Sequence, residues 1–285
     1  MKKIAVINDL SGFGKCSLSV ALPIISVLGV QCVPLATAVF TSQTGFEHYY
    51  YTDLTDMITQ YIKYWKINNA SFDGIYTGYI TDHKQAKLVS QFIDEFKKDT
   101  NILLVDPVMG DDGCTYKTFT NDLLDIHKSL TRRANIITPN VTEACLLADI
   151  PIKEILNCKE DTKELLKLGK TVAETLKNKA LTNQEVIITG IKAKNEDDSY
   201  SVYNLVNSEN KITYSSSPMI KKSFSGTGDL FASTIIGLKM KGIDTINAVQ
   251  TAQNFISKSI NDTPCDINTC EGIYFEKNLS ELLNS

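Results

Sequence analysis

The sequence predicts an α/β protein in which helices cover both faces of a mostly parallel β-sheet. Strand-like apolar runs alternate with amphipathic helix-like runs along most of the 285 residues, which is typical of a sheet built from βαβ units. Two strand-like runs, residues 200–206 and 211–215, flank a polar turn and predict a small antiparallel hairpin. No repeat, low-complexity segment or linker-like break interrupts this pattern. We therefore expect one domain over residues 1–285.

The strands are predicted where short apolar runs end at a polar residue, a glycine or a proline. Asp106-Pro107 stops one of these runs, and Pro139 stops another. Strands are expected at residues 3–8, 30–35, 73–78, 102–105, 135–138 and 185–188. Residues 37–46 are polar and contain a glycine, so we expect a loop there.

The helices are predicted where apolar residues recur at helical spacing. Gly29 ends the first of them, and Pro23 inside it predicts a kink. A later helix carries an apolar stripe from Leu230 to Leu238 and stops at Gly242. Helices are expected at residues 15–28, 53–65, 83–97, 122–130, 141–147, 161–176, 230–241 and 243–260.

Composition limits the classes of function. The chain is 43% apolar with a formal net charge of −4, whereas a protein that binds nucleic acid usually carries a basic face. No apolar run reaches membrane-spanning length, and the one near the N-terminus is too short for a signal-peptide core. The seven cysteines form no C-x-x-C pair, so we expect reduced thiols. These features predict a cytoplasmic protein that binds neither nucleic acid nor membrane.

The stretch Ser225-Gly226-Thr227-Gly228-Asp229 opens the helix that stops at Gly242. A glycine-rich turn at a helix N-terminus gathers unpaired N–H groups and the positive end of the helix dipole, which favours an anion. The carboxylate of Asp229 would repel an anion bound there, so its presence needs an explanation. One explanation is that Asp229 takes the proton from a group that attacks a bound phosphate. The alternative interpretation is a glycine-rich loop with an Asp cap.

A second glycine-containing turn, residues 11–17, also lies between a strand and a helix. The phosphate-binding pattern G-x-x-x-x-G-K-S/T would need glycine at position 9 and Ser or Thr at position 16. Asp9 and Cys16 occupy these positions. We therefore reject a phosphate-binding loop of this type here, and Asp9 stays as a polar candidate for a pocket edge at the end of the first predicted strand.

Two acidic segments follow predicted strands. Residues 106–113 contain Asp106 and Asp111, and the segment that begins at Thr138 carries Asn140 and Glu143. Mg²⁺ typically binds one or two carboxylates and otherwise keeps water and phosphate oxygens. The alternative for residues 106–113 is a turn built from Asp, Pro and Gly. The alternative for Glu143 is an acid that only stabilises the first turn of a helix. Because parallel strands present their carboxyl ends at one edge, these side chains predict a ligand site there.

Taken together, five ordered motifs resemble those of the ribokinase-like small-molecule kinases, and within them the pyridoxal kinase branch. The motifs are residues 226–232, 106–111, 137–143, 77–82 and 40–45. The resemblance implies a three-layer α/β/α sandwich and a homodimer. It also implies transfer of the γ-phosphoryl group of ATP to the 5′-hydroxymethyl group of a B6 vitamer, with Mg²⁺ and a monovalent cation such as K⁺.

The resemblance assigns roles to individual residues of this chain. Asp229 would be the general base, and Gly226, Thr227 and Gly228 would form the anion hole. Asp9, Thr44, Tyr79 and Tyr116 would contact the vitamer. Asp111, Thr138, Asn140, Thr189, Thr227 and Gly228 would contact ATP, and Asp106, Asp111 and Glu143 would lie near metal.

Two positions depart from the pyridoxal kinase pattern and keep other functions open. Asp9 stands where many pyridoxal kinases have Ser, and Gln43 stands where they have His. The segment Asp9-Leu10-Ser11-Gly12 is similar to the first loop of hydroxymethylpyrimidine kinases. A non-catalytic vitamer-binding protein with this fold is a third hypothesis. Cys114 is a further candidate, since a thiol can add reversibly to an aldehyde substrate.

Overall fold

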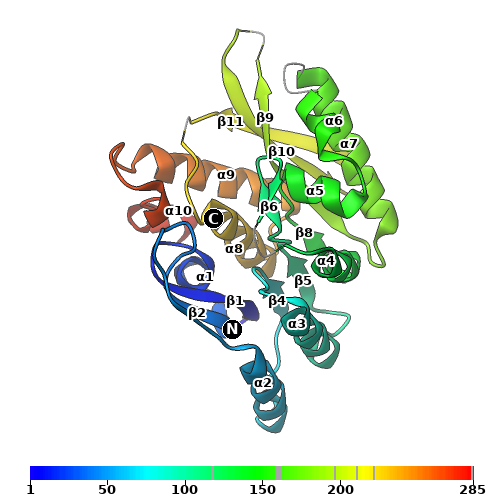
Figure 1. Ribbon diagram of the computed structural model, residues 1–285, viewed down its shortest axis with the longest axis vertical. Helices are drawn as coiled ribbons and strands as arrows, with labels where there is room; N and C mark the ends of the chain where they lie inside the picture. Colours follow the sequence, from blue (N-terminus) through cyan, green and yellow to red (C-terminus); the bar gives the residue numbers. More distant parts are fainter. Residues whose placement is uncertain (117–118, 158–161, 196, 210, 221, 284) are drawn as a thin grey trace. The chain divides into compact units, whose positions relative to one another are not determined.

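The computed structural model describes residues 1–285 except 117–118, 158–161, 196, 210, 221 and 284 (Figure 1). Contacts within the chain divide it into two compact units. The first unit contains residues 1–103 and 220–285, and the second unit contains residues 104–219. The expectation of one domain stays a prediction.

The described part of the first unit holds four strands in the order β4-β1-β2-β3. They are β1 (Lys3–Phe13), β2 (Gln31–Ser42), β3 (Tyr51–Asp53) and β4 (Gly74–Thr77). β1 runs parallel to β2 and to β4, and β3 is antiparallel to β2 (Figure 1). Residues 4–9 of β1 are buried in succession, so protein covers both faces of this strand.

The helices of the first unit form two packed groups. α1 (Ser17–Val27) packs against α8 (Thr227–Met240), which packs against α9 (Thr245–Asn261). α2 (Thr55–Ile67) and α3 (His83–Phe96) pack on each other. α8 is buried at every position from Leu230 to Leu238, so protein surrounds this helix on all sides and not only along the predicted apolar stripe. The chain continues through η1 (Thr269–Glu271), η2 (Glu276–Asn278) and α10 (Leu279–Leu283).

A second run of strands has the order β5-β8-β9-β10-β11, and all of it except the first two residues of β5 belongs to the second unit. They are β5 (Ile102–Val105), β8 (Ile136–Ile137), β9 (Glu185–Lys194), β10 (Tyr200–Ser208) and β11 (Lys211–Pro218). β5, β8 and β9 are parallel, and β10 is antiparallel to both of its neighbours. The helices are α4 (Asn121–Arg133), α5 (Val141–Ala148), α6 (Ile152–Asn157) and α7 (Thr162–Lys179), and β6 (Gly110–Asp111) pairs with β7 (Cys114–Thr115).

The predicted fold class is confirmed, because a mostly parallel sheet, flanking helices and the antiparallel β10–β11 hairpin are all present. The expectation of a loop at residues 37–46 is wrong over its first half. β2 continues to Ser42 because Val39 and Phe40 pair with the extension of β1 beyond Asp9. The short elements β3 and α6 were not predicted. None of the helices in the described residues is long and apolar enough to cross a membrane.

Candidate active site

The glycine-rich turn of the first unit forms the N-terminus of α8. Gly226 is the N-cap residue with φ of +79°, a conformation that residues other than glycine rarely adopt. A Cβ at this position would lie 1.9 Å from the carbonyl oxygen of Lys15, so only glycine fits. The first hydrogen bond within the helix runs from the N–H of Leu230 to the carbonyl oxygen of Gly226. The N–H groups of Thr227, Gly228 and Asp229 therefore precede the helical ladder and can serve a ligand.

Asp229 is half-buried in the first turn of α8. Its Oδ1 accepts a hydrogen bond from Asn8 Nδ2 at 3.1 Å and lies 3.5 Å from the hydroxyl of Tyr76. The backbone N–H of Ser17 favours the ionised form of this carboxylate and lowers its pKa. Burial raises the pKa of Asp229 to about 6, and the charge of Asp9 adds to this, although the three donors oppose it. This pKa suits a general base near neutral pH.

The orientation of the Asn8 amide is fixed by its own acceptor contacts. Asn8 Oδ1 accepts the N–H of Asp9 at 3.1 Å and the N–H of Tyr79 at 2.9 Å. Gly78 leaves room for this amide, because a Cβ there would lie 2.3 Å from Asn8 Nδ2. With the oxygen held by two N–H groups, the NH₂ group must point to Asp229.

Asp9 is buried, and its two oxygens are held by hydroxyl groups. Ser17 Oγ donates to Oδ1 at 2.6 Å, and Ser11 Oγ donates to Oδ2 at 3.0 Å. Burial raises the pKa of Asp9. Burial, followed by the charges of Asp229 and Asp9, also raises the pKa of the Cys16 thiol to about 12. Contact between Asp9 and the substrate stays a prediction, and the geometry gives Asp9 the further role of holding the turn between β1 and α1.

Gln43 connects the loop after β2 to the glycine-rich turn before α8. Its Nε2 donates to Ser225 Oγ at 3.2 Å and to the carbonyl oxygen of Cys270 at 2.9 Å, and its Oε1 accepts the N–H of Gly45 at 2.8 Å. The next residue, Thr44, is exposed, and Tyr79 is half-buried. Gln43 therefore supports the residue that precedes the glycine-rich turn.

In the second unit, two buried acids lie near each other after β5 and β8. Asp106 Oδ1 accepts a hydrogen bond from Thr138 Oγ1 at 2.8 Å. Glu143 Oε1 accepts the N–H of Met109 at 3.0 Å, and Oε2 accepts the N–H of Asn140 at 2.9 Å. Burial, with the nearby charge of Asp106, raises the pKa of Glu143 well above its usual range. Asn140 and Glu143 thus form the capping box of α5.

The acidic segment after Asp106 folds into the β6–β7 hairpin. Asp112 and Gly113 at its tip both have positive φ, of 48° and 84°, which is typical of a two-residue hairpin turn. Asn140 Nδ2 donates to the carbonyl oxygen of Gly110 at 2.7 Å and joins the hairpin to the start of α5. Asp111 and Tyr116 are exposed, while Thr189 pairs with Asn140 through an isolated bridge.

The residues after β5 and β8 fit a magnesium ion. Asp106 and Glu143 are buried acids whose charges oppose each other, and a divalent cation would offset this repulsion. Among the described residues, no group of three or more His, Cys, Asp or Glu side chains could hold a metal. The pair alone suits Mg²⁺, which completes its shell with water and phosphate oxygens.

The predicted site residues divide between the two units. The first unit holds Asp9, Thr44, Tyr79, Gly226, Thr227, Gly228 and Asp229. The second unit holds Asp106, Asp111, Tyr116, Thr138, Asn140, Glu143 and Thr189. Sequence reasoning gave no role to Asn8, Ser17 or Tyr76. Only Asn8 carries a sequence signal, as a polar residue at the end of an apolar strand.

Comparison with known proteins agrees with this fold. The family model described as phosphomethylpyrimidine kinase matches residues 21–273. A candidate phosphomethylpyrimidine kinase from Bacteroides thetaiotaomicron, solved in a crystal form with pyridoxal, is 36% identical with a TM-score of 0.88. That match covers 99% of this chain and 95% of the other.

Relatives with named activities include a pyridoxal kinase and a hydroxymethylpyrimidine/phosphomethylpyrimidine kinase. The pyridoxal kinase of Dictyostelium discoideum is 25% identical over 68% of this chain and 63% of its own length. The hydroxymethylpyrimidine/phosphomethylpyrimidine kinase of Bacillus subtilis is 26% identical over 67% of this chain and 64% of its own length. This chain spans only part of three relatives that are named as pyridoxal kinases or candidate pyridoxal kinases: it matches 49%, 50% and 63% of their lengths.

By these matches, the chain has the fold of a class of small-molecule kinases. Since the family model extends over most of the sequence, the chain belongs to the phosphomethylpyrimidine kinase family.

Proposed function

We propose that this protein is an ATP-dependent kinase that phosphorylates the 5′-hydroxymethyl group of a B6 vitamer: pyridoxal, pyridoxine or pyridoxamine. The observation that carries the proposal is the position of Asp229. Its carboxylate lies in the first turn of α8 and has a pKa of about 6. A hydrogen bond from Asn8 Nδ2 holds it in place.

The residues of the first unit would carry the proton transfer. Asp229 is ionised at neutral pH and takes the proton of the alcohol. The alcohol oxygen forms its bond to the γ-phosphorus of ATP, and the bond from phosphorus to ADP breaks. The N–H groups of Thr227 and Gly228, with the dipole of α8, stabilise the charge on the transferred phosphoryl group.

The residues of the second unit would bind the nucleotide and the metal. Asp111, Thr138, Asn140 and Thr189 contact the nucleotide phosphates in this proposal. Asp106 and Glu143 hold Mg²⁺, which when bound neutralises phosphate charge. In this proposal Thr44, Tyr79 and Tyr116 contact the vitamer, and a monovalent cation such as K⁺ lies beside Asp106. We also propose that the protein is a homodimer and is located in the cytoplasm.

Hydroxymethylpyrimidine is the second candidate substrate. The match to the phosphomethylpyrimidine kinase model and the relative from Bacillus subtilis favour it. The pyridoxal in the crystal form of the relative from Bacteroides thetaiotaomicron favours the vitamer. Both alcohols are primary and attached to a heteroaromatic ring, so the same base and anion hole serve either.

The test is a substrate panel. The purified protein is incubated with Mg·ATP and, separately, with each of the three vitamers and with hydroxymethylpyrimidine. The products are identified by mass. We expect a monophosphate with at least one vitamer and a higher kcat/KM for it than for the pyrimidine. A clear preference for the pyrimidine supports the second candidate, and no product with any alcohol contradicts both.

A further inference from the structure

A cavity of about 300 Å³ lies in the second unit, where α4, α5 and α7 contribute to its lining. α5 packs against both α4 and α7 (Figure 1). The volume is at the lower end of the range for small-molecule sites. One wall of the cavity is apolar and consists of the buried side chains Ile137, Leu147 and Leu176. The cavity therefore has the space and the apolar surface that a small organic ligand needs.

The same cavity is lined by four charged side chains: Lys128, Arg132, Lys179 and Asp149. Three cations and one acid give this lining a formal charge of +2, although the whole chain carries a net charge of −4. A concave surface with an excess of one sign of charge concentrates ligands of the opposite sign. The charge of the lining therefore favours an anion, and a dianion would match it.

The charges on the lining are not all neutralised by one another. Lys128 Nζ donates to Asp149 Oδ1, and Lys179 Nζ donates to Oδ2 at 2.8 Å, so one carboxylate serves two ammonium groups. Arg132 is exposed, and its Nε donates to the carbonyl oxygen of Lys179 at 2.9 Å. Among the described residues, no carboxylate pairs with Arg132. The guanidinium of Arg132 thus keeps its NH₂ donors for a ligand.

The ends of the helices explain part of this positive charge. A helix C-terminus attracts cations, and Lys179 Nζ donates to the carbonyl oxygen of Ala148, the last residue of α5, at 3.1 Å. Contacts of this kind account for a lysine beside a helix end. They leave Arg132 without a carboxylate, next to an apolar wall. That arrangement suits an anionic group attached to an apolar body.

The charged part of the cavity lies away from the residues that we propose for the nucleotide. Thr138 and Asn140 follow β8, so they lie at the carboxyl edge of the parallel strands. Arg132 precedes β8, and Gln184 precedes β9, so these two lining residues lie at the amino edge. A ligand held by Arg132 therefore does not occupy the proposed nucleotide site.

We propose that this cavity is a second ligand site and that it binds a small organic phosphate monoester. The phosphate group contacts Arg132 and the two lysines, and the apolar body lies against Leu147 and Leu176. Arg132 suits phosphate because its planar guanidinium can donate two parallel hydrogen bonds to two oxygens. The inference does not rest on the proposed kinase function, because it uses none of the residues that have a role there.

Methyl NMR of the whole chain tests the proposal, with phenyl phosphate as the probe. The titration is made at about pH 8, where a phosphate monoester is a dianion. We expect the methyl signals of Leu147 and Leu176 to shift as phenyl phosphate is added. If they do not move up to roughly 10 mM, where a site with a millimolar Kd is mostly occupied, the proposal is wrong. Inorganic phosphate should shift them less, and equal shifts would contradict the role of the apolar wall.

Two variants with opposite expected effects test where the anion binds. Arg132→Gln removes the guanidinium, so the Kd for phenyl phosphate should rise about tenfold, as for one lost hydrogen bond to a charged group. Asp149→Asn removes a negative charge from the lining, so the Kd should fall about fivefold, as expected for one charge about 4 Å away in water. Asn also tolerates the positive φ of Asp149, which is 64°.

Lys167→Gln is the matched control, because Lys167 is an exposed cation of α7 that lies outside the lining and pairs with Glu164. Its Kd for phenyl phosphate should equal that of the wild type. A Kd for Arg132→Gln no higher than that of Lys167→Gln contradicts the proposal, and so does a Kd for Asp149→Asn that does not fall. The result for Asp149→Asn decides the question even if Arg132→Gln fails to fold.

Discussion

Asn8 and Asp229 lie 221 positions apart in the chain and are joined by a hydrogen bond of 3.1 Å from Asn8 Nδ2 to Asp229 Oδ1. The bond connects the end of the apolar part of β1 to the first turn of α8. Because Asn8 Oδ1 is occupied by two backbone N–H groups, the amide has one orientation. Asn8 therefore holds the carboxylate and lowers its pKa, against the effect of burial.

The Asn8→Ala variant tests this relationship. Removal of a donor that favours the ionised form raises the pKa of Asp229 further. The acidic limb of the kcat/KM profile should therefore move to higher pH, and kcat should fall by roughly tenfold. The measurement is a pH–rate profile with saturating Mg·ATP.

Asn101→Ala is the control for Asn8→Ala. Asn101 is also buried in the first unit, where its Nδ2 donates to the carbonyl oxygen of Phe96. This control should lose stability without any shift of the acidic limb. An unshifted limb in Asn8→Ala would show that Asn8 does not act on the base.

The pKa of Asp229 also predicts how stability depends on pH. In the folded protein this pKa is about 6, above its value in the unfolded chain, so folding favours the protonated carboxyl. The contribution is complete below the unfolded-state pKa and is lost as the pH rises through about 6. Asp229→Asn removes the group and hence this loss.

Urea denaturation over a pH series measures this effect. Between about pH 4 and pH 7, the free energy of unfolding should fall less in Asp229→Asn than in the wild type. The difference should reach at most about 3 kcal/mol, since one pKa unit corresponds to about 1.4 kcal/mol. Parallel curves for the two proteins would contradict the raised pKa.

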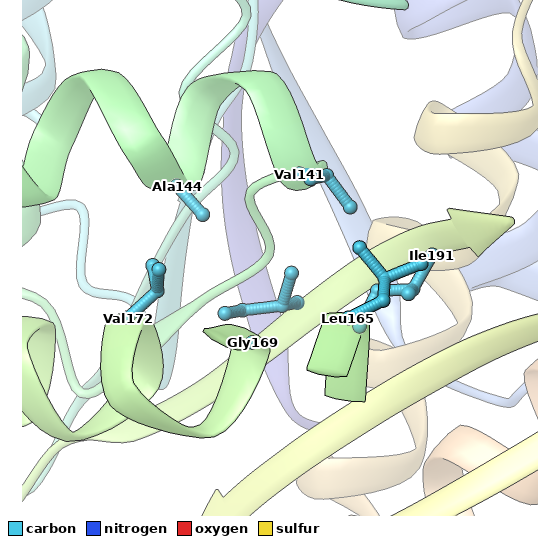
Figure 2. Close-up of a pocket in the computed structure, with 7 residues that line it drawn as sticks. Val141, Ala144, Leu165, Gly169, Val172 and Ile191 are labelled. Carbon is cyan, nitrogen blue, oxygen red and sulfur yellow. The ribbon is translucent and has the colours of Figure 1, made fainter. Parts of the chain in front are cut away.

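A small apolar cavity in the second unit offers a test of packing. Gly169 of α7, Val172, Leu165 and Ile191 line this cavity (Figure 2). The volume of the cavity is about 10 Å³. A Cβ at Gly169 would lie 3.4 Å from Ile191 Cδ1, an ordinary contact. Because glycine inside a helix costs about 1 kcal/mol relative to alanine, Gly169→Ala should raise the free energy of unfolding by up to this amount.

Gly237→Ala in α8 is the opposite case. A Cβ there would lie 2.4 Å from Cδ1 of the buried Leu28, which would have to move. Thermal unfolding should give a higher midpoint for Gly169→Ala and a lower one for Gly237→Ala. A lower midpoint for Gly169→Ala would mean that the space beside α7 cannot take a methyl group.

Asp106→Asn tests the proposed metal site. The variant keeps the shape of the side chain and an oxygen for Thr138 Oγ1 but loses one of two opposing charges. The Mg²⁺ concentration for half-maximal activity should rise roughly tenfold or more, as expected when a metal site loses a supporting carboxylate. Asp149→Asn, which removes an exposed acid paired with Lys128 and Lys179, should leave it unchanged. Equal Mg²⁺ dependence in Asp106→Asn and the wild type would remove Asp106 from the metal site.

The sequence predicted the parts of the fold and site that depend on local pattern. The glycine-rich turn before Asp229 and the β10–β11 hairpin follow from residues close together in the chain. The contact between Asn8 and Asp229 is different, because no spacing rule relates residues so far apart. The conformation of Ser17 depends on a buried partner, Asp9, and the extension of β2 to Ser42 depends on pairing with β1. These features arise from tertiary contacts.

The central claim is that Asp229 removes the proton of the alcohol during phosphoryl transfer. The most direct measurement is kcat for phosphorylation of a B6 vitamer by the wild type and by Asp229→Asn at saturating Mg·ATP, with nucleotide affinity measured in parallel. We predict a loss of roughly 100-fold or more in kcat with nearly unchanged ATP binding. Turnover close to that of the wild type in Asp229→Asn would contradict the claim.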